Sequence, residues 1–433
     1  MIFRIGSTAQ GRLILAVSAS LAVFLSFFAV RVFLAEQARG RNTLGGYERA
    51  TRLEPDNADN WFALGRYLQY DAPIPDLERA ITAYRSGLTR NPHSYSAWLE
   101  VAMAYESENR LTECQAAFAQ AETAYPLSPD VAWRYGNFLL RQNELSSGFE
   151  RIRRAVQLDP SRAAEAFSIC SRFLLGTNIE GLLDTVIPPS PSAYEAVLQA
   201  LCSKRDFADA LSVWDRLVLM KPRLAVTSVA ELVGGLQQAG RSLDAKRVWD
   251  QASALAGFSY PQLDPDSLLW DGGFETGVSG FGYAWTYASA SGGVQILRDP
   301  TQPHSGANAL RIAFDGKTDI RFVDVCHRVP VEASARYLFS AWIRTESVSS
   351  DQGVRFGLWA MNVRDNGEKI TADFRGTLPW TRVESDWTAP PGATEMQVCV
   401  VRYATDQPDS RIRGVVWIDD VAVVRSKATP DAK

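Results

Sequence analysis

The sequence predicts a multidomain protein with an N-terminal transmembrane helix, an all-α superhelix of repeated hairpins, and an all-β sandwich at the C-terminal end. Three observations support this prediction. An uncharged apolar run stands near the N-terminus, prolines then recur at a fixed interval, and the last third of the chain consists of short alternating runs. The chain has 433 residues, which is long enough for two or three domains.

The apolar run extends from Leu13 to Val30, contains no charge, and is flanked by Arg12 and Arg31. Its 18 residues are close to the minimum for a membrane-spanning helix and exceed most signal-peptide cores. We therefore predict a cytoplasmic stub over residues 1–12 and an uncleaved signal-anchor helix over residues 13–35. Cleavage near Ala35 is the alternative. More arginines follow the run than precede it, which by itself favours a cytoplasmic side for the rest of the chain. The character of the C-terminal domain, described below, argues for the opposite side, and we give it more weight.

The middle of the chain repeats every 34 residues, at Pro92, Pro126 and Pro160. A period in the thirties is typical of stacked helical hairpins. Small residues precede each proline by five positions, where two helices cross closely, and the proline itself ends the second helix. These small residues are Gly87, Ala121 and Ala155.

The repeat is irregular at both ends and has one insertion. Tyr47, Ala50 and Pro55 reproduce only the end of the pattern, so we expect a first hairpin that is half present. The residues 71–75 (DAPIP) supply a turn that lengthens the next unit. The pattern weakens between residues 161 and 193, and we count about six hairpins in all.

These features resemble tetratricopeptide repeats over residues 42–257. The resemblance implies a right-handed superhelix whose first helices line a groove for a peptide or a protein partner. From the repeat phase, the residues expected in this groove are Asn60, Arg66, Gln69, Glu100, Arg134, Asn137 and Arg141. The alternative for each of them is a merely solvated side chain.

Residues 258–266 are expected to form a linker, because PQLDP at 261–265 separates the helical repeats from short alternating apolar runs with many turn residues. Beyond it, runs such as RYLFSAWIRT and MQVCVVRY alternate in the manner of strands. About eight to ten strands in some 160 residues predict an antiparallel sandwich over residues 267–426. Residues 427–433 are expected to be a disordered tail.

The motifs LLWDGGFETG, HSGANALRIAF, RYLFSAWIRT and VVWIDDVAVV follow one another in this part of the chain. This ordered set resembles the carbohydrate-binding modules of families 4 and 9, which form a galactose-binding-like jelly roll. Such modules stack aromatic rings on sugars and hold the hydroxyls with polar groups. The residues expected to bind a sugar are Tyr283, Trp285, Tyr287, Arg355, Trp359, Trp380 and Tyr403. Core packing is the alternative for every tryptophan.

The resemblance also implies a structural Ca²⁺ held by Glu275 and Asp420, because oxygen ligands suit this ion. A hydrogen-bonded structural carboxylate is the alternative, and no other cofactor is expected. Cys326 and Cys399 lie on two predicted strands and form either a disulfide or two free core thiols. The other cysteines, Cys114, Cys170 and Cys202, are expected to be buried small apolar residues.

No catalytic set is recognisable, so we expect a protein that is not an enzyme. A glycosidase needs two carboxylates across a cleft, whereas Asp419 and Asp420 are adjacent on one strand and should point to opposite faces. A net charge of −4 argues against a nucleic-acid partner.

The sequence therefore predicts a single-pass protein of the inner (cytoplasmic) membrane whose C-terminal domains are periplasmic. It would be a scaffold that binds a protein through its repeats and a polysaccharide through its sandwich, in cell-envelope or exopolysaccharide assembly. A purely protein–protein scaffold is the alternative, and a glycoside-processing enzyme is a weaker one.

Overall fold

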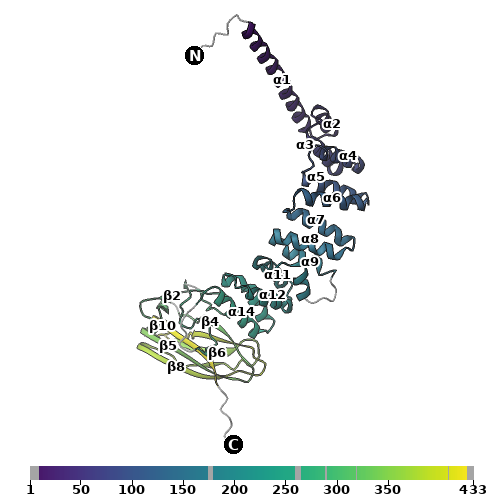
Figure 1. Ribbon diagram of the computed structural model, residues 1–433. Coiled ribbons are helices and arrows are strands. Elements are labelled where there is room, and N and C mark those ends of the chain that lie inside the picture. The colour runs from purple at the N-terminus through teal and green to yellow at the C-terminus, as the bar shows by residue number, and fades with distance from the viewer. Residues whose placement is uncertain are drawn as a thin grey trace. The chain divides into compact units, whose positions relative to one another are not determined.

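The computed structural model describes residues 9–173, 179–258, 265–287, 290–317, 319–407 and 409–426. The predicted tail, most of the N-terminal stub and most of the linker lie outside these residues. The chain divides into two compact units, Met1–Ala196 and Val197–Lys433, which are described separately (Figure 1).

The first unit is helical, as predicted. It contains a long helix followed by shorter helices that pair along the chain. These are α1 (Ala9–Arg39), α2 (Leu44–Leu53), α3 (Ala58–Arg66), the π-helical turn η1 (Tyr67–Asp71), α4 (Leu77–Leu88), α5 (Tyr95–Ser107), α6 (Leu111–Ala124), α7 (Pro129–Arg141), α8 (Leu145–Leu158), the 3₁₀ turn η2 (Pro160–Arg162), α9 (Ala163–Cys170), α10 (Ile179–Val186) and the first part of α11 (Pro191–Ser203).

Two of the recurring prolines, Pro55 and Pro92, are linked to the helix that follows by the same hydrogen bond. The indole nitrogen of Trp98 donates to the carbonyl oxygen of Pro92 at 2.8 Å, and Trp61 donates to Pro55 at the same distance. A hydroxyl then caps the first helix, as Ser94 does by accepting from the N–H of Ala97. The tryptophan six residues after a proline therefore ties the turn to the helix that follows.

Small residues allow the helices of a hairpin to cross closely. A Cβ on Gly65 of α3 would lie 2.8 Å from the ring of Tyr84 on α4. The ring is fully buried and fills the space that the glycine leaves. This arrangement explains why the repeat needs a small residue opposite a large one, and an alanine at Gly65 would displace Tyr84.

The first hairpin is complete, which corrects the expectation that it is half present. Helix α1 continues without a break to Arg39, and its last turns supply the missing first helix. Ala35 and Ala38 are buried against α2, where Ala50 is also fully buried. The apolar part of α1 is exposed, and Gly11–Arg39 is long and apolar enough to cross a membrane.

The second unit contains the end of α11, three more helices and the strands. The helices are α12 (Phe207–Leu219), α13 (Ala230–Gln238), which follows the 3₁₀ turn η3 (Val226–Val229), and α14 (Ser242–Leu255). The strands are β1 (Ala290–Ser291), β2 (Val294–Asp299), β3 (Ala309–Asp315), β4 (Phe322–Pro330), β5 (Arg336–Ser349), β6 (Arg355–Ala360), β7 (Lys369–Ile370), β8 (Gly376–Thr388), β9 (Glu395–Arg402) and β10 (Arg413–Arg425).

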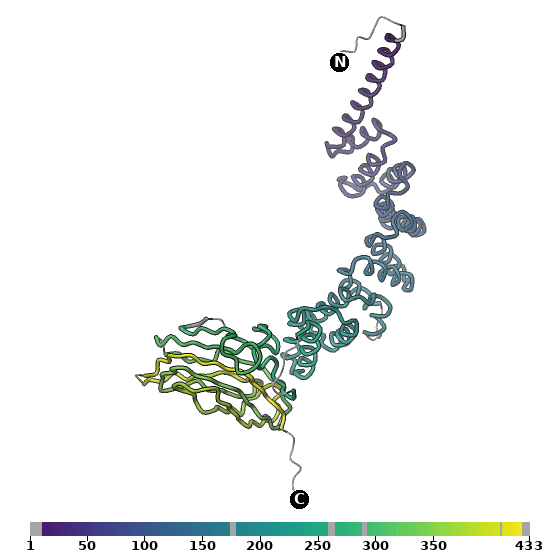
Figure 2. Tube along the Cα trace, turned by 60° about the vertical axis from the view of Figure 1, so that its left-hand side comes forward, coloured from purple at the N-terminus to yellow at the C-terminus, as the bar shows by residue number. Residues whose placement is uncertain are grey.

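The strands form two antiparallel sheets, which confirms the predicted sandwich. One sheet has the order β1-β2-β3-β10-β5-β8 and the other has the order β4-β9-β6-β7. Their inner faces share one apolar core, to which β6 contributes Phe356, Leu358 and Ala360 at every second position. Figure 2 shows the two layers, with the last helices of this unit beside them.

The last helical hairpin shares a core with the sandwich. Trp249 of α14 is fully buried, and its ring contacts Trp270, Phe281 and Tyr283 from the segment that leads into the sheets. A Cβ on Gly282 would lie 2.4 Å from the Trp249 ring. Helix α14 is therefore packed against the sandwich as closely as one core element against another.

The three cysteines of the helical repeats are buried and unpaired, as expected. Burial raises the pKa of the thiols of Cys114, Cys170 and Cys202 to about 12. These thiols are neutral at physiological pH and pack as small apolar groups.

Candidate functional site

The candidate site is the outer face of the four-stranded sheet. Trp359 of β6 lies opposite Gln397 of β9, and its indole N–H donates to the Gln397 amide oxygen at 3.1 Å. A Cβ on Gly357 would lie 2.6 Å from the Trp359 ring. Because Gly357 has no side chain, the indole lies directly on the strand. It stays partly exposed, as a ring that stacks on a sugar must.

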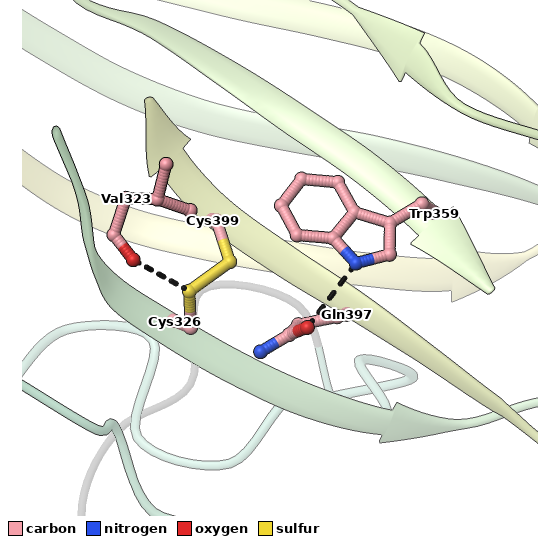
Figure 3. Close-up of a disulfide and its surroundings, with 5 residues drawn as sticks. All are labelled: Val323, Cys326, Trp359, Gln397 and Cys399. Carbon is pink, nitrogen blue, oxygen red and sulfur yellow. Dashed lines mark hydrogen bonds between the residues drawn. A yellow bond between two sulfur atoms is a disulfide. The ribbon is translucent and has the colours of Figure 1, made fainter. Parts of the chain in front are cut away.

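A disulfide lies on the same outer face. Cys326 of β4 and Cys399 of β9 are directly opposite each other in the ladder and are bonded (Figure 3). Of the two possibilities for these cysteines, a disulfide or two free core thiols, the structure has the disulfide. The disulfide, Val401 and Ile370 form a small apolar cluster that Trp359 joins. The ring is thus held in place from its side and from beneath.

Polar groups stand beside the ring on the same strand. Arg355 lies two pleats from Trp359 and donates to the Gln352 amide oxygen at 2.6 Å. Its guanidinium is 3.6 Å from the Asp373 carboxylate and lies over the Tyr403 ring at 5.5 Å. The Nε atom of Arg355 is buried and has no hydrogen-bond partner among the described residues. Of the predicted residues, Arg355 and Tyr403 are therefore in contact, and Arg355 shares the outer face of β6 with Trp359.

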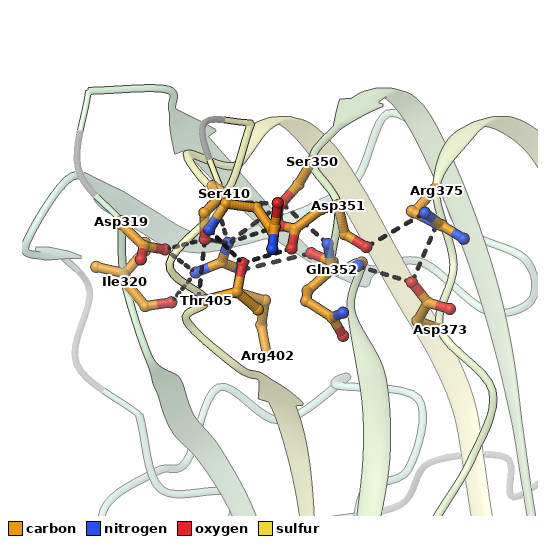
Figure 4. A network of polar contacts seen from close by, with 12 residues as sticks. Asp319, Ile320, Ser350, Asp351, Gln352, Asp373, Arg375, Arg402, Thr405 and Ser410 are labelled. Carbon is orange, nitrogen blue, oxygen red and sulfur yellow. Dashed lines mark hydrogen bonds and ion pairs between the residues drawn. The ribbon is translucent and has the colours of Figure 1, made fainter.

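Arg402 holds the loops at this end of the sandwich and was not anticipated from the sequence. Its side chain is fully buried and pairs with Asp319 at 2.6 Å. It also donates to the backbone oxygens of Ile320 and Ser410 and to the Ser350 hydroxyl (Figure 4). The only sequence signal was an arginine at the end of the apolar run MQVCVVRY.

Two of the residues expected to bind a sugar, Tyr283 and Trp285, lie in the interior instead, and the partly buried Tyr287 packs against that core. Tyr283 is completely buried and donates to the carbonyl oxygen of Ser242 at 2.8 Å and to Glu395 at 3.1 Å. Trp285 is 2% exposed and donates to the carbonyl oxygen of Asp271, and Tyr287 packs against the core. Their positions follow from packing against α14 and between the sheets, so we do not include them in the site.

Trp380 belongs to the other sheet and is not part of the site. It lies on β8, where its ring is 5.5 Å from the imidazole of His304. The same imidazole stacks on Trp342 at 3.9 Å. Strand β8 and strand β6 belong to different sheets, so Trp380 and Trp359 do not form one surface.

The two carboxylates expected to bind Ca²⁺ accept hydrogen bonds. Glu275 accepts from the N–H of Ala307 at 2.7 Å and from both nitrogens of Asn308. Asp420 accepts from the Ser305 hydroxyl at 2.6 Å and contacts the His304 ring. Among the described residues, His, Cys, Asp and Glu form no group of three that would suit a metal ion. These contacts favour the alternative of structural carboxylates, and bound Ca²⁺ stays a prediction.

Asp419 and Asp420 converge on one loop, which corrects the expectation that they point to opposite faces. The backbone of Asp420 has a φ of 48°, and the ladder shifts register between Asp419 and Ala422. This bulge turns both carboxylates toward the loop at residues 304–305, where Asp419 accepts from the N–H of His304.

The Asp419 carboxyl predicts a pH dependence of stability. Burial, and then the charge of Asp420, raise its pKa to about 7. The native state therefore keeps a proton between about pH 4 and pH 7 that the unfolded state releases, so raising the pH removes stability. Relative to Asp419→Asn, we expect the wild type to lose about 2 kcal/mol of unfolding free energy from pH 5 to pH 8. Denaturant unfolding at each pH measures this difference.

The control for this prediction is His327, whose contribution has the opposite sign. Burial lowers its pKa to about 3, so the imidazole stays neutral in the native state while the unfolded state binds a proton below about pH 6.5. The wild type should therefore lose stability as the pH falls below about 6.5, and His327→Gln should lack this part of the loss. An unchanged pH profile in Asp419→Asn would contradict the prediction for Asp419.

Three of the predicted groove residues are structural. Asn60 is 1% exposed and donates to Glu54 at 3.4 Å. Gln69 is buried and accepts from the Tyr84 hydroxyl at 2.9 Å, whereas Asn137 donates to the Trp133 carbonyl of its own helix. Asn60 and Gln69 thus satisfy the repeat interior, and the partly buried Asn137 amide bonds within its own helix, so we do not include these three residues in the candidate groove.

The other four groove residues remain accessible on first helices. Arg66 and Arg134 are exposed, and Glu100 accepts from the Tyr70 hydroxyl at 2.7 Å across two hairpins. Arg141 pairs with Glu106 at 2.8 Å in the same way. Charges of both signs thus alternate along neighbouring first helices, with Tyr70 half exposed among them.

Residues 76–113 match the family model of the tetratricopeptide repeat. The match covers α4, α5 and the first residues of α6, and it includes Pro92, the first proline of the 34-residue period. This part of the helical region is therefore a tetratricopeptide repeat. No curated protein matches the chain.

Solved structures resemble the two parts of the chain separately. YrrB, described as a tetratricopeptide-repeat protein with an unusual peptide-binding site, is 14% identical, with a TM-score of 0.26, over 50% of this chain and 94% of its own. A family 16 carbohydrate-binding module is 15% identical, with a TM-score of 0.26, over 36% and 99%. TmCBM61, solved with β-1,4-galactotriose, is 20% identical, with a TM-score of 0.26, over 37% and 99%.

Proposed function

We propose that the protein is a membrane-anchored scaffold that binds a polysaccharide through the outer face of the β4-β9-β6-β7 sheet and a protein partner through its repeats. The Trp359 ring on that face carries the proposal for the sugar. It is a flat, partly exposed aromatic surface with an amide at one edge and an arginine along the same strand. This combination is what recognition of a pyranose ring requires.

The anchor and the compartment belong to the same proposal. Helix α1 would cross the membrane uncleaved, because loss of the chain up to Ala35 would remove most of the helix that packs against α2. The disulfide between Cys326 and Cys399 supports an oxidising, extracytoplasmic location for the sandwich, since such bonds are rare in the cytosol. The proposal includes a role in cell-envelope or exopolysaccharide assembly, which this combination of parts supports.

The proposal also includes a peptide or protein partner for the repeats. The accessible first-helix residues Arg66, Glu100, Arg134 and Arg141 present both signs of charge, and the half-exposed Tyr70 donates to Glu100 among them. A partner with acidic and basic side chains in alternation would match this surface, and an aromatic ring supplies an apolar contact.

Affinity electrophoresis of the full chain in detergent, with a panel of soluble polysaccharides, tests sugar binding. We expect Trp359→Ala to weaken retention at least about tenfold, which corresponds to about 1.4 kcal/mol. Trp380→Ala is the matched control, because it removes a partly exposed tryptophan from the other sheet and should leave retention unchanged. Retention of the wild type by none of the polysaccharides would favour the protein–protein scaffold, and release of reducing sugar would favour an enzyme.

A further inference from the structure

The first two helices form an antiparallel pair in which the end of α2 returns to the apolar part of α1. The Arg31 Nε atom donates to the carbonyl oxygen of Leu53 at 2.7 Å. At the other end of the pair, a Cβ on Gly46 would lie 2.4 Å from the carbonyl oxygen of Ala38. The last residue of α2 is therefore level with Arg31, and the α1–α2 turn lies farther along.

The exposed apolar surface of α1 ends at about the same level. Leu13 and Phe33 are each 65% exposed, and large apolar side chains between them are exposed as well. At about 1.5 Å per residue, this band is about 30 Å long, which equals the hydrocarbon thickness of a bilayer. Arg31 lies about 3 Å from the end of the band. The end of α2 and the turn after it are thus at the bilayer boundary.

The charges at this level suit the headgroup layer. Arg52, one residue from the end of α2, is exposed, and Arg31 is half-buried. The Glu54 carboxylate accepts hydrogen bonds from the side-chain amides of Asn57 and Asn60, so it points toward the hairpin. Asp56 is exposed in the same turn. Arginine binds phosphate through charge-assisted hydrogen bonds, and long basic side chains reach headgroups from just inside the boundary.

We propose that residues 54–57, the turn between α2 and α3, lie in the headgroup layer, with Arg31 and Arg52 against phospholipid phosphates. This inference rests on the proposed membrane anchor and specifies what it contacts. The repeats are then not tethered to the membrane by a flexible linker. Their first hairpin contacts the bilayer surface directly, because its first helix is the end of α1, the helix that crosses the membrane.

Quenching of a fluorophore by headgroup-attached nitroxide lipids tests the proposal in the full chain. A fluorophore is placed on Asp56→Cys or on Asn42→Cys, in vesicles of phosphatidylcholine and phosphatidylglycerol. The free native cysteines are buried and do not compete for the label. Along the chain, position 42 is nine residues beyond Phe33, and position 56 is 23 residues beyond it. We nevertheless expect quenching to be several-fold stronger at position 56.

The outcomes separate this inference from the anchor itself. Equal quenching, or stronger quenching at position 42, in a chain that resists alkaline carbonate extraction would overturn the inference and keep the anchor. Extraction by carbonate would overturn the anchor. Arg52→Gln should reduce quenching at position 56, whereas Arg41→Gln, the same change at the far turn, should not. Equal effects of the two changes would overturn the phosphate contact.

Discussion

Replacement of Arg402 by methionine is expected to lower the unfolding free energy of the sandwich by about 3–5 kcal/mol. The guanidinium is fully buried and pairs with Asp319, and it satisfies backbone oxygens from two separate loops. Methionine fills much of the same volume but leaves these acceptors without a donor. The cost is therefore that of buried backbone oxygens left without their donor and of an Asp319 carboxylate that loses its cation. Equilibrium unfolding in urea, followed by tryptophan fluorescence, measures this loss.

Arg425→Gln is the matched control for this prediction. Arg425 is also on a strand of the sandwich and pairs with Glu332 at 2.7 Å, but both side chains are about half exposed. We expect it to change stability by less than about 1 kcal/mol, because solvent screens an exposed ion pair. Similar losses for the two variants would show that burial does not decide the contribution of Arg402.

Removal of the disulfide by Cys326→Ala with Cys399→Ala is expected to cost about 4 kcal/mol. The bond closes a loop whose ends are 73 residues apart in sequence, and opening it frees the unfolded chain. Denaturation of the wild type with and without a thiol reductant should give the same difference. The stability of the double variant should not change with the reductant. A change would mean that the effect of the reductant on the wild type does not come from this disulfide.

The same bond reports the compartment of the sandwich. Cells are quenched with acid, and the protein is then unfolded and alkylated. We expect three modified thiols, those of Cys114, Cys170 and Cys202. Modification of all five cysteines would mean that the disulfide is reduced in the cell, which would contradict the proposed extracytoplasmic location.

The repeats were predictable because their sequence signal is local and recurs. The prolines and the small residues before them recur at fixed offsets and interact within one hairpin or with the next, so the period alone predicted the architecture. The first hairpin was not predictable in this way. Its first helix is the end of α1, whose apolar composition gave no sign that Ala35 and Ala38 also pack against α2.

The candidate site was predictable only in part, because sequence does not tell which aromatic residues are buried. Trp359 was expected in the site because it lies on a predicted strand with Arg355 nearby and next to polar sequence, and the structure places it on an outer face. Tyr283 and Trp285 follow a glycine-rich turn, the same kind of context, yet α14 and the sheets cover them. Arg402 illustrates the reverse case, since its partners are between 8 and 83 residues away in sequence.

The packing of Trp249 against Trp270 and Tyr283 sets where the C-terminal part of the chain can be cut. A fragment that begins at the linker would carry bare aromatic rings and the buried carboxyl of Glu395 to its surface, and it would tend to aggregate. A fragment meant for crystallisation or for glycan binding should therefore begin before α13. Because the last hairpin and the sandwich share a core, they should move as one rigid unit, and a force applied to either one is transmitted directly to the other.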